Sequence, residues 1–114
     1  MAVKEAPQDM IDKVLEAVEI ARTTGKICKG TNETTKAIEK GKAKLVVVAK
    51  DVSPAEIVMH IPAIAAEKNV PCVQIPKKDD LGSAAGIDVS TGSVAIINEG
   101  DAKNLIKEIV EKLQ

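Results

Sequence analysis

Residues 43–62 read AKLVVVAKDVSPAEIVMHIP, and this stretch decides the fold class. Its first part, Leu45–Ala49, is a run of apolar and mostly β-branched residues, which predicts a short strand buried on both faces. Ser53, Pro54 and Glu56 follow, and this order of an N-cap residue, a proline at the first helical position and a capping-box glutamate predicts a helix start. A buried strand that leads directly into a helix is typical of an α/β protein.

Further strand and helix signals alternate on both sides of this stretch. Short apolar runs bounded by glycine or proline predict three more strands, over residues 26–29, 72–75 and 93–97. Apolar residues at helical spacing predict helices over residues 8–23, 31–40, 53–69, 79–85 and 101–113. The alternation predicts an α/β fold in which helices cover both faces of one sheet. No linker or repeat interrupts the pattern, so residues 1–114 are expected to form a single domain.

Particular residues mark the ends and interruptions of these helices. Asp9, Thr31 and Asp101 have side chains suited to an N-cap, so we expect them to cap the first, second and last helices. Pro62 lies inside the third predicted helix and has no backbone N–H, so we expect a kink near residues 59–62.

The composition restricts the classes of protein to which the chain can belong. Hydrophobic residues make up 45% of its 114 residues, which is enough for a folded core, yet Phe, Trp and Tyr are all absent. The core must therefore be aliphatic, and any RNA binding must proceed without aromatic stacking. Because natural domains of this size normally contain aromatic residues, we hypothesise an engineered sequence or a reduced amino-acid alphabet.

Charge and cysteine content narrow the classes further. The net charge of −1 does not predict nucleic-acid or membrane binding from the molecule as a whole. The chain has no apolar run of membrane-spanning length and no signal-peptide pattern, so we expect a cytoplasmic protein with no membrane partner. Cys28 and Cys72 are isolated and lack metal-ligand spacing. This predicts two reduced structural cysteines and no metal or cofactor, although a disulfide between them stays open.

The candidate catalytic groups have simpler explanations. His60 is the single histidine and lies among apolar residues of a predicted helix, which favours a structural role. Asp79 and Asp80 lie at the start of a short helix, where acids stabilise the helix dipole. The stretch LGSAAG, residues 81–86, lacks the spacing of a phosphate or dinucleotide loop and is better explained by close helix–sheet packing. The sequence therefore predicts that the protein is not an enzyme.

A basic segment over residues 26–44 is the strongest charge asymmetry. It contains six lysines and two glutamates, a local charge of +4, so the remainder of the chain carries −5. The asymmetry indicates a basic face on an otherwise acidic protein, which would attract a phosphate backbone. A solvated lysine-rich helix and loop explain the charge alone equally well.

Asn32 and Glu33 lie at a predicted helix start within this basic segment. A helix start offers free backbone N–H groups that suit a phosphate. The Glu33 carboxylate, however, only accepts hydrogen bonds and would repel phosphate, so its place is explained if it accepts from base donors such as guanine N1–H and N2–H. The pair therefore predicts recognition of RNA bases, with the lysines positioning the backbone.

Five stretches of the chain resemble one family of RNA-binding proteins. They are GTNETTKA (30–37), AKLVVVAKDVSPAEIVMHIP (43–62), EKNVPC (67–72), LGSAAGIDV (81–89) and SVAIINEGDA (93–102). Together they are similar to the archaeal large-subunit ribosomal protein L7Ae family, over nearly the whole chain from about Gly25 onward. The resemblance implies an α-β-α sandwich around a four-stranded mixed sheet. It also implies a non-catalytic protein that binds kink-turn RNA, a sharply bent duplex with a short bulge flanked by tandem sheared G·A pairs.

The resemblance further implies which residues contact the RNA. The family's matching asparagine and glutamate, here Asn32 and Glu33, contact the guanines of the sheared pairs, and the matching lysine, Lys36, contacts backbone and bases. The remaining implied contacts are to phosphates, from Lys29, Gly30 and Thr31, and to the extruded bulge nucleotide, from Ile87, Asp88 and Val89. The implied partners are ribosomal RNA, the guide RNAs of box C/D and box H/ACA particles, ribonuclease P, and the core proteins of these ribonucleoproteins. The free protein is expected to be a monomer.

Two other functions stay open from the sequence. A protein-interaction or scaffold domain would use the apolar loop of residues 87–89 as a docking surface, with RNA binding weakened by the missing aromatics. A small-molecule-binding or enzymatic domain would use the glycine-bearing turn of residues 81–86.

Overall fold

The computed structural model of the chain describes residues 4–5, 7–51, 56–88 and 90–113. Within these residues a mixed sheet has the strand order β1-β4-β3-β5-β2. Its strands are β1 (Lys4–Glu5), β2 (Lys26–Lys29), β3 (Leu45–Ala49), β4 (Cys72–Ile75) and β5 (Ser93–Asn98). β4 is parallel to β1 and β3, whereas β5 is antiparallel to β3 and β2. The four strands predicted from the sequence are confirmed, and β1, with only two residues, adds an edge strand to them.

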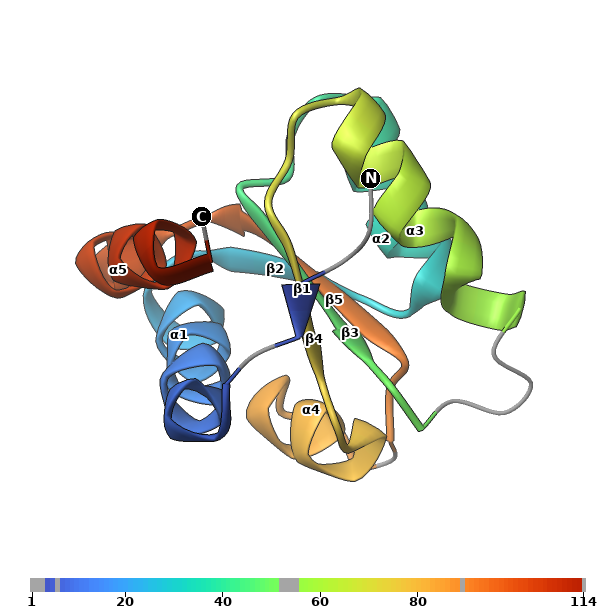
Figure 1. Ribbon diagram of the computed structural model, residues 1–114. Coiled ribbons are helices and arrows are strands. Elements are labelled where there is room, and N and C mark those ends of the chain that lie inside the picture. Colours follow the sequence, from blue (N-terminus) through green and yellow to red (C-terminus); the bar gives the residue numbers. More distant parts are fainter. Residues whose placement is uncertain (1–3, 6, 52–55, 89, 114) are drawn as a thin grey trace.

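β3 is a central strand, and all five of its side chains are buried. Its backbone pairs with β4 on one side and β5 on the other, so Val47 lies opposite both Val73 and Val94. Helices cover both faces of the sheet (Figure 1), which explains why an uninterrupted apolar run encodes this strand. The prediction of a strand buried on both faces is confirmed.

One helix layer contains α1 (Ile11–Thr24), α4 (Lys78–Ala84) and α5 (Lys103–Leu113). In Figure 1 these helices lie to the left of and below the sheet. Their buried aliphatic side chains pack on one face of the sheet, in a cluster that includes Val14, Val18, Leu81, Ile109, Val47 and Ile96. At the surface, Lys13 Nζ donates to Glu108 Oε1 at 2.6 Å, and this ion pair joins α1 to α5.

The other layer contains α2 (Thr31–Glu39) and α3 (Glu56–Glu67), which lie side by side against the opposite face (Figure 1). Ile38 of α2 and Ile61 of α3 are fully buried and pack in one cluster with Val46 and Val48 of β3. Alternate residues of β3 thus enter two separate aliphatic cores. The three-layer α-β-α sandwich expected from the sequence is confirmed.

Two of the predicted N-caps, Asp9 and Asp101, are wrong. Each aspartate lies inside a 3-10 turn that precedes the α-helix, Gln8–Met10 before α1 and Gly100–Ala102 before α5. The backbone N–H of Asp101 donates to the Thr24 hydroxyl at 2.8 Å, so a contact with the end of α1 holds this turn. At Asp101, a contact between segments distant in the sequence thus overrides the local preference for aspartate at a cap.

The third predicted N-cap, Thr31, is also wrong. Thr31 is the first residue of α2, the N-cap position belongs to Gly30, and no side chain caps this helix. Gly30 has a φ of +91°, a backbone conformation that side-chain-bearing residues rarely adopt. The chain uses it to turn from β2 into α2, which moves the helix start by one residue.

α3 continues through Pro62. The kink expected near residues 59–62 stays a prediction. Ser53 and Pro54, which were predicted to start this helix, lie outside the described residues.

Candidate nucleic-acid interface

The sheet topology brings the start of α2 and the segment that contains Ile87 and Asp88 to the same end of the sheet. β2, β3 and β4 run in one direction and β5 runs against them. The end of β2, from which α2 starts, therefore lies beside the beginning of β5, where Lys29 pairs with Val94. Ile87 and Asp88 belong to the segment that leads into β5, so they lie at the same end of the sheet. Val89, the last residue of the predicted loop, lies outside the described residues.

Gly30 determines where α2 begins. Its N–H donates to the Ser93 carbonyl at 3.0 Å, and its own carbonyl accepts from the Thr34 N–H at 3.0 Å. A Cβ at this position would meet no atom within 4 Å, so the glycine is needed for its positive φ and not for space. The helix start is thereby tied to the first residue of β5.

The first turns of α2 separate side chains that face solvent from those that enter the core. Asn32, Glu33 and Lys36 are exposed, and in the part of the chain that the structure describes their side chains make no hydrogen bond or ion pair. Thr34 is fully buried, and Thr31 is partly buried. The polar groups predicted to contact RNA bases are therefore free to accept a ligand.

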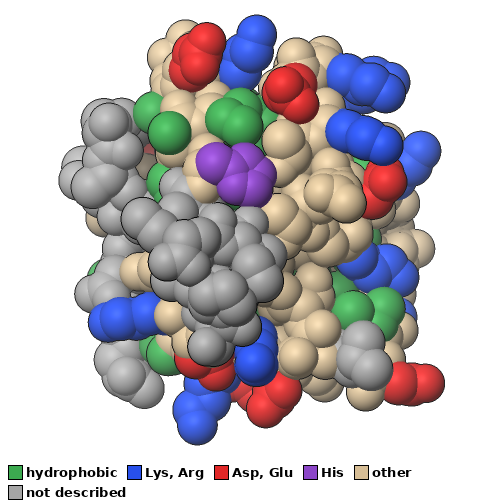
Figure 2. Space-filling view, turned by 90° about the vertical axis from the view of Figure 1, so that its right-hand side faces the viewer, with side chains coloured by type: hydrophobic (Ala, Val, Ile, Leu, Met, Phe, Trp, Pro, Cys, Tyr) green, Lys and Arg blue, Asp and Glu red, His purple; other side chains and the backbone are tan. Residues whose placement is uncertain are grey.

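Thr35 joins the start of α2 to α3. Its hydroxyl donates to the Thr31 carbonyl at 2.8 Å and lies 2.9 Å from His60 Nε2. Figure 2 shows the histidine at the surface of this face of the molecule. The structural role predicted for His60 stays a prediction, and its partner on α2 was not indicated by the sequence.

A second contact that sequence reasoning missed joins two other segments at this end of the sheet. Asp51 follows β3, and its Oδ1 accepts from the backbone N–H of Lys78, where α4 starts, at 2.8 Å. A short polar side chain two residues after a buried strand is the signal that could have pointed to such a contact. Asp79 and Asp80 lie in the first turn of α4, as the helix-dipole explanation predicted.

The stretch of residues 81–86 packs against the sheet. Its buried residues are Leu81, Gly82, Ala84 and Ala85. This confirms the packing interpretation. The N–H of Ile87 donates back to the Gly82 carbonyl at 3.1 Å, which leaves the Ile87 side chain partly buried and Asp88 exposed.

The lysines of the basic segment reach solvent. All six are exposed: Lys26, Lys29, Lys36, Lys40, Lys42 and Lys44. Figure 2 shows basic side chains gathered along the right-hand edge of this face, with acidic side chains among them. Lys29 and Lys36 lie near the start of α2, whereas Lys26 begins β2 and Lys44 precedes β3 at the other end of the sheet, so the six lysines do not form one basic face.

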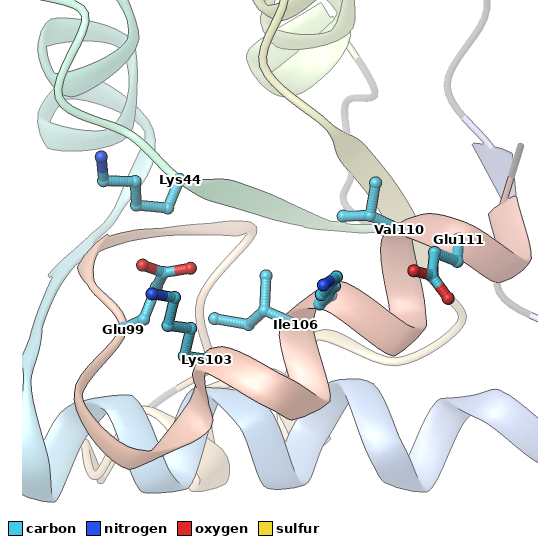
Figure 3. Close-up of a pocket in the computed structure, with 7 residues that line it drawn as sticks. Lys44, Glu99, Lys103, Ile106, Val110 and Glu111 are labelled. Atoms are coloured by element: carbon cyan, nitrogen blue, oxygen red, sulfur yellow. The ribbon is translucent and has the colours of Figure 1, made fainter.

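A pocket of about 290 Å³ lies at the opposite end of the sheet (Figure 3). It is formed between α5 and the residues that precede β3 and follow β5. Its apolar lining is Ile106 and Val110, and its charged lining is Lys44, Glu99, Lys103, Lys107 and Glu111. Because β2 ends and β5 begins at the other end, this pocket is separate from the start of α2.

The part of the chain that the structure describes contains two cysteines, no metal-binding cluster and no membrane-spanning helix. The described residues contain no group of three or more His, Cys, Asp or Glu side chains that could hold a metal ion. None of their helices is long and apolar enough to cross a membrane. Cys28 and Cys72 are free, and burial raises the pKa of Cys72 to about 12, which keeps its thiol protonated near neutral pH. The predicted reduced cysteines are confirmed.

The chain is similar to known proteins over nearly its whole length. Residues 12–106 match the profile of the ribosomal protein L7Ae/L30e/S12e/Gadd45 family. Among solved structures, the Giardia lamblia 15.5kD RNA binding protein is similar, with a TM-score of 0.92 and 35% sequence identity. That match covers 98% of this chain and 93% of the Giardia chain, so both halves of the candidate interface lie within the shared fold.

Proposed function

Because the chain belongs to the ribosomal protein L7Ae/L30e/S12e/Gadd45 family, we propose that it binds kink-turn RNA through the start of α2. The observation that carries the proposal is the exposed pair Asn32–Glu33, held at an anchored helix start and flanked by exposed lysines. The name of the Giardia protein, which describes it as RNA binding, supports the same class of ligand.

The carboxylate of Glu33 supplies the specificity in this proposal. It accepts hydrogen bonds from guanine N1–H and N2–H, and the amide of Asn32 both donates and accepts beside it. An ordinary A-form duplex hides the base edges in a narrow major groove, whereas the sheared G·A pairs of a kink-turn expose them. A carboxylate within a basic surface therefore selects bent RNA and disfavours plain duplex.

The lysines and the loop before β5 complete the interface. Lys29 and Lys36 attract the phosphate backbone on either side of the readout pair, while Gly30 and Thr31 let the backbone approach closely. The loop of Ile87, Asp88 and Val89 holds the extruded bulge nucleotide, and its Ile87 and Val89 side chains supply aliphatic contacts, which need no aromatic ring. In this proposal the free protein is a monomer, and it assembles on ribosomal RNA, on guide RNAs or in ribonuclease P together with their core proteins.

Binding to a kink-turn RNA and to the same RNA with its G·A pairs replaced by Watson–Crick pairs tests the proposal. We expect the protein to prefer the kink-turn strongly. Glu33→Ala should weaken kink-turn binding by about tenfold to a hundredfold, because a well-formed bidentate base contact contributes about 1–3 kcal/mol of discrimination. Titration with a gel-shift readout measures the dissociation constants for the two RNAs.

Glu39→Ala is the matched control, because Glu39 is an exposed glutamate at the far end of the same helix. It removes the same charge and should leave the preference intact. Equal affinity of the unchanged protein for the two RNAs would show that the proposed specificity is wrong.

A further inference from the structure

A hydrogen-bond relay crosses from α3 to the first turn of α2. His60 Nε2 lies 2.9 Å from the Thr35 hydroxyl oxygen, and that hydroxyl lies 2.8 Å from the Thr31 carbonyl oxygen. His60 and Thr35 are 25 residues apart in the sequence, so only the packing of α3 on α2 brings them together.

The directions of these hydrogen bonds follow from the atoms available. A hydroxyl has one proton, and the Thr35 proton is donated to the Thr31 carbonyl. The Thr35 oxygen can then only accept from His60, so Nε2 carries the proton that it donates. The relay therefore runs in one direction, from imidazole to hydroxyl to the carbonyl at the helix start.

A second set of contacts holds the other side of the same helical turn, and we call it the second anchor. There the Gly30 N–H is bonded to the Ser93 carbonyl of β5, and the Thr34 side chain is fully buried. Asn32 and Glu33 lie in sequence between these anchors, with no side-chain bond of their own among the described residues. Their orientation is therefore set by the backbone that the two anchors hold.

We propose that His60 and Thr35 are positioning residues that hold the first turn of α2 in the orientation in which Asn32 and Glu33 meet their ligand. The proposal rests on the proposed RNA-binding function. Preorganisation of a binding element raises affinity because less ordering is left to occur on binding. The relay thereby adds to the discrimination between RNAs without touching the RNA.

Four variants test the relay. Thr35→Val removes the hydroxyl and keeps the branched shape, and Thr35→Ser keeps the hydroxyl. His60→Ala removes the donor, and His60→Gln restores an N–H donor at similar reach. The matched control is Thr23→Val on α1, because the Thr23 hydroxyl also bonds a carbonyl one turn back, at 3.1 Å to Ile20, in the other helix layer.

Thr35→Val and His60→Ala should each weaken kink-turn binding by about threefold to tenfold, the range of one neutral hydrogen bond. Binding to the G·A-replaced RNA should be unchanged, and the double variant should be no weaker than either single variant because both break one relay. Thr35→Ser and His60→Gln should restore most of the affinity, and Thr23→Val should have no effect. Additive losses, or equal losses for both RNAs, would overturn the proposal.

Amide hydrogen exchange of the RNA-free protein separates this proposal from the proposed function. The N–H groups of Thr34 and Thr35 should exchange about threefold to tenfold faster in Thr35→Val and His60→Ala, because one neutral hydrogen bond that holds the turn is lost. Unchanged exchange at these two amides would refute the relay even if RNA binding were specific. If exchange rises as expected while the unchanged protein fails to distinguish the two RNAs, the relay stands and the kink-turn function fails.

Discussion

Neighbouring residues at the start of α2 have different tasks. Gly30 turns the chain and ties it to β5, Thr34 fills the core, and Thr35 bonds to α3. Asn32 and Glu33 are left exposed with free polar groups. A helix start is suited to this division because successive side chains point in directions about 100° apart. One turn can therefore be buried, bonded and available for a ligand at the same time.

Gly30→Ala, compared with Gly41→Ala, tests whether the turn at Gly30 positions the binding residues of α2. Both glycines have positive φ, +91° and +72°, and an added Cβ would meet no atom within 4 Å at either position. Gly30→Ala should lower the free energy of unfolding by about 1–3 kcal/mol, because φ +91° with ψ 157° is a conformation that essentially only glycine adopts. Gly41→Ala should lower it by about 1–2 kcal/mol, the cost of a side chain in left-handed backbone. Urea unfolding measures each loss.

Only the alanine at position 30 should also weaken RNA binding, because Gly41 follows the far end of α2. Equal effects of the two variants on binding, measured where both remain folded, would show that the turn into α2 does not position the site.

The two helix layers affect the site differently. α2 is held by β2 and β5 beneath it and by α3 beside it. Its buried Ile38 packs with Ile61 in the core between these helices and the sheet. The core under α1 and α5 lies across the sheet and contains Ile109. A packing change in the core under α2 therefore shifts the helix that carries Asn32 and Glu33. A packing change in the core under α5 lies on the other side of the sheet from that helix.

Ile38→Val and Ile109→Val test this difference between elements. Both side chains are fully buried, and removal of one methyl group should destabilise each variant by about 0.5–1.5 kcal/mol. We expect Ile38→Val to weaken kink-turn binding and Ile109→Val to leave it unchanged, with both measured well below the unfolding midpoint. If both variants lost RNA affinity in proportion to their loss of unfolding free energy, the two helix layers would affect the binding site equally.

The whole molecule carries a charge of −1, and its positive charge is concentrated in residues 26–44. Within this segment the fold places Lys29 and Lys36 near the start of α2, whereas Lys44 lines the pocket at the opposite end together with Lys103 and Lys107 of α5. Attraction to a phosphate backbone falls off within about 10 Å at moderate salt, so position matters more than total charge.

The salt dependence of RNA binding tests whether the position of a lysine matters more than the net charge of the molecule. Lys36→Gln and Lys103→Gln each lower the net charge by one unit. Lys36→Gln should reduce the slope of log K against log salt by about 0.7–0.9, because one phosphate contact is lost. Lys103→Gln should leave the slope unchanged, and an equal reduction by both would mean that net charge and not the α2 surface attracts the RNA.

Local sequence patterns determined much of the fold and proposed the site. The apolar run of β3, the other three long strands and the helices on either side were all predictable, because burial and turn preferences act over a few neighbouring residues. Glu33 also stood out without a structure, because a carboxylate at a helix start among lysines is explained if it accepts hydrogen bonds from base donors.

Tertiary structure decided the strand order, the true helix starts and the contacts that hold the site. Asp9, Thr31 and Asp101 were wrong as caps because the neighbouring backbone is held by turns or by distant segments. The relay from His60 to Thr35 joins two helices whose sequences contain no sign of each other. Hydrogen bonds depend on which groups packing brings within about 3 Å, and that distance is set only when the whole sandwich is assembled.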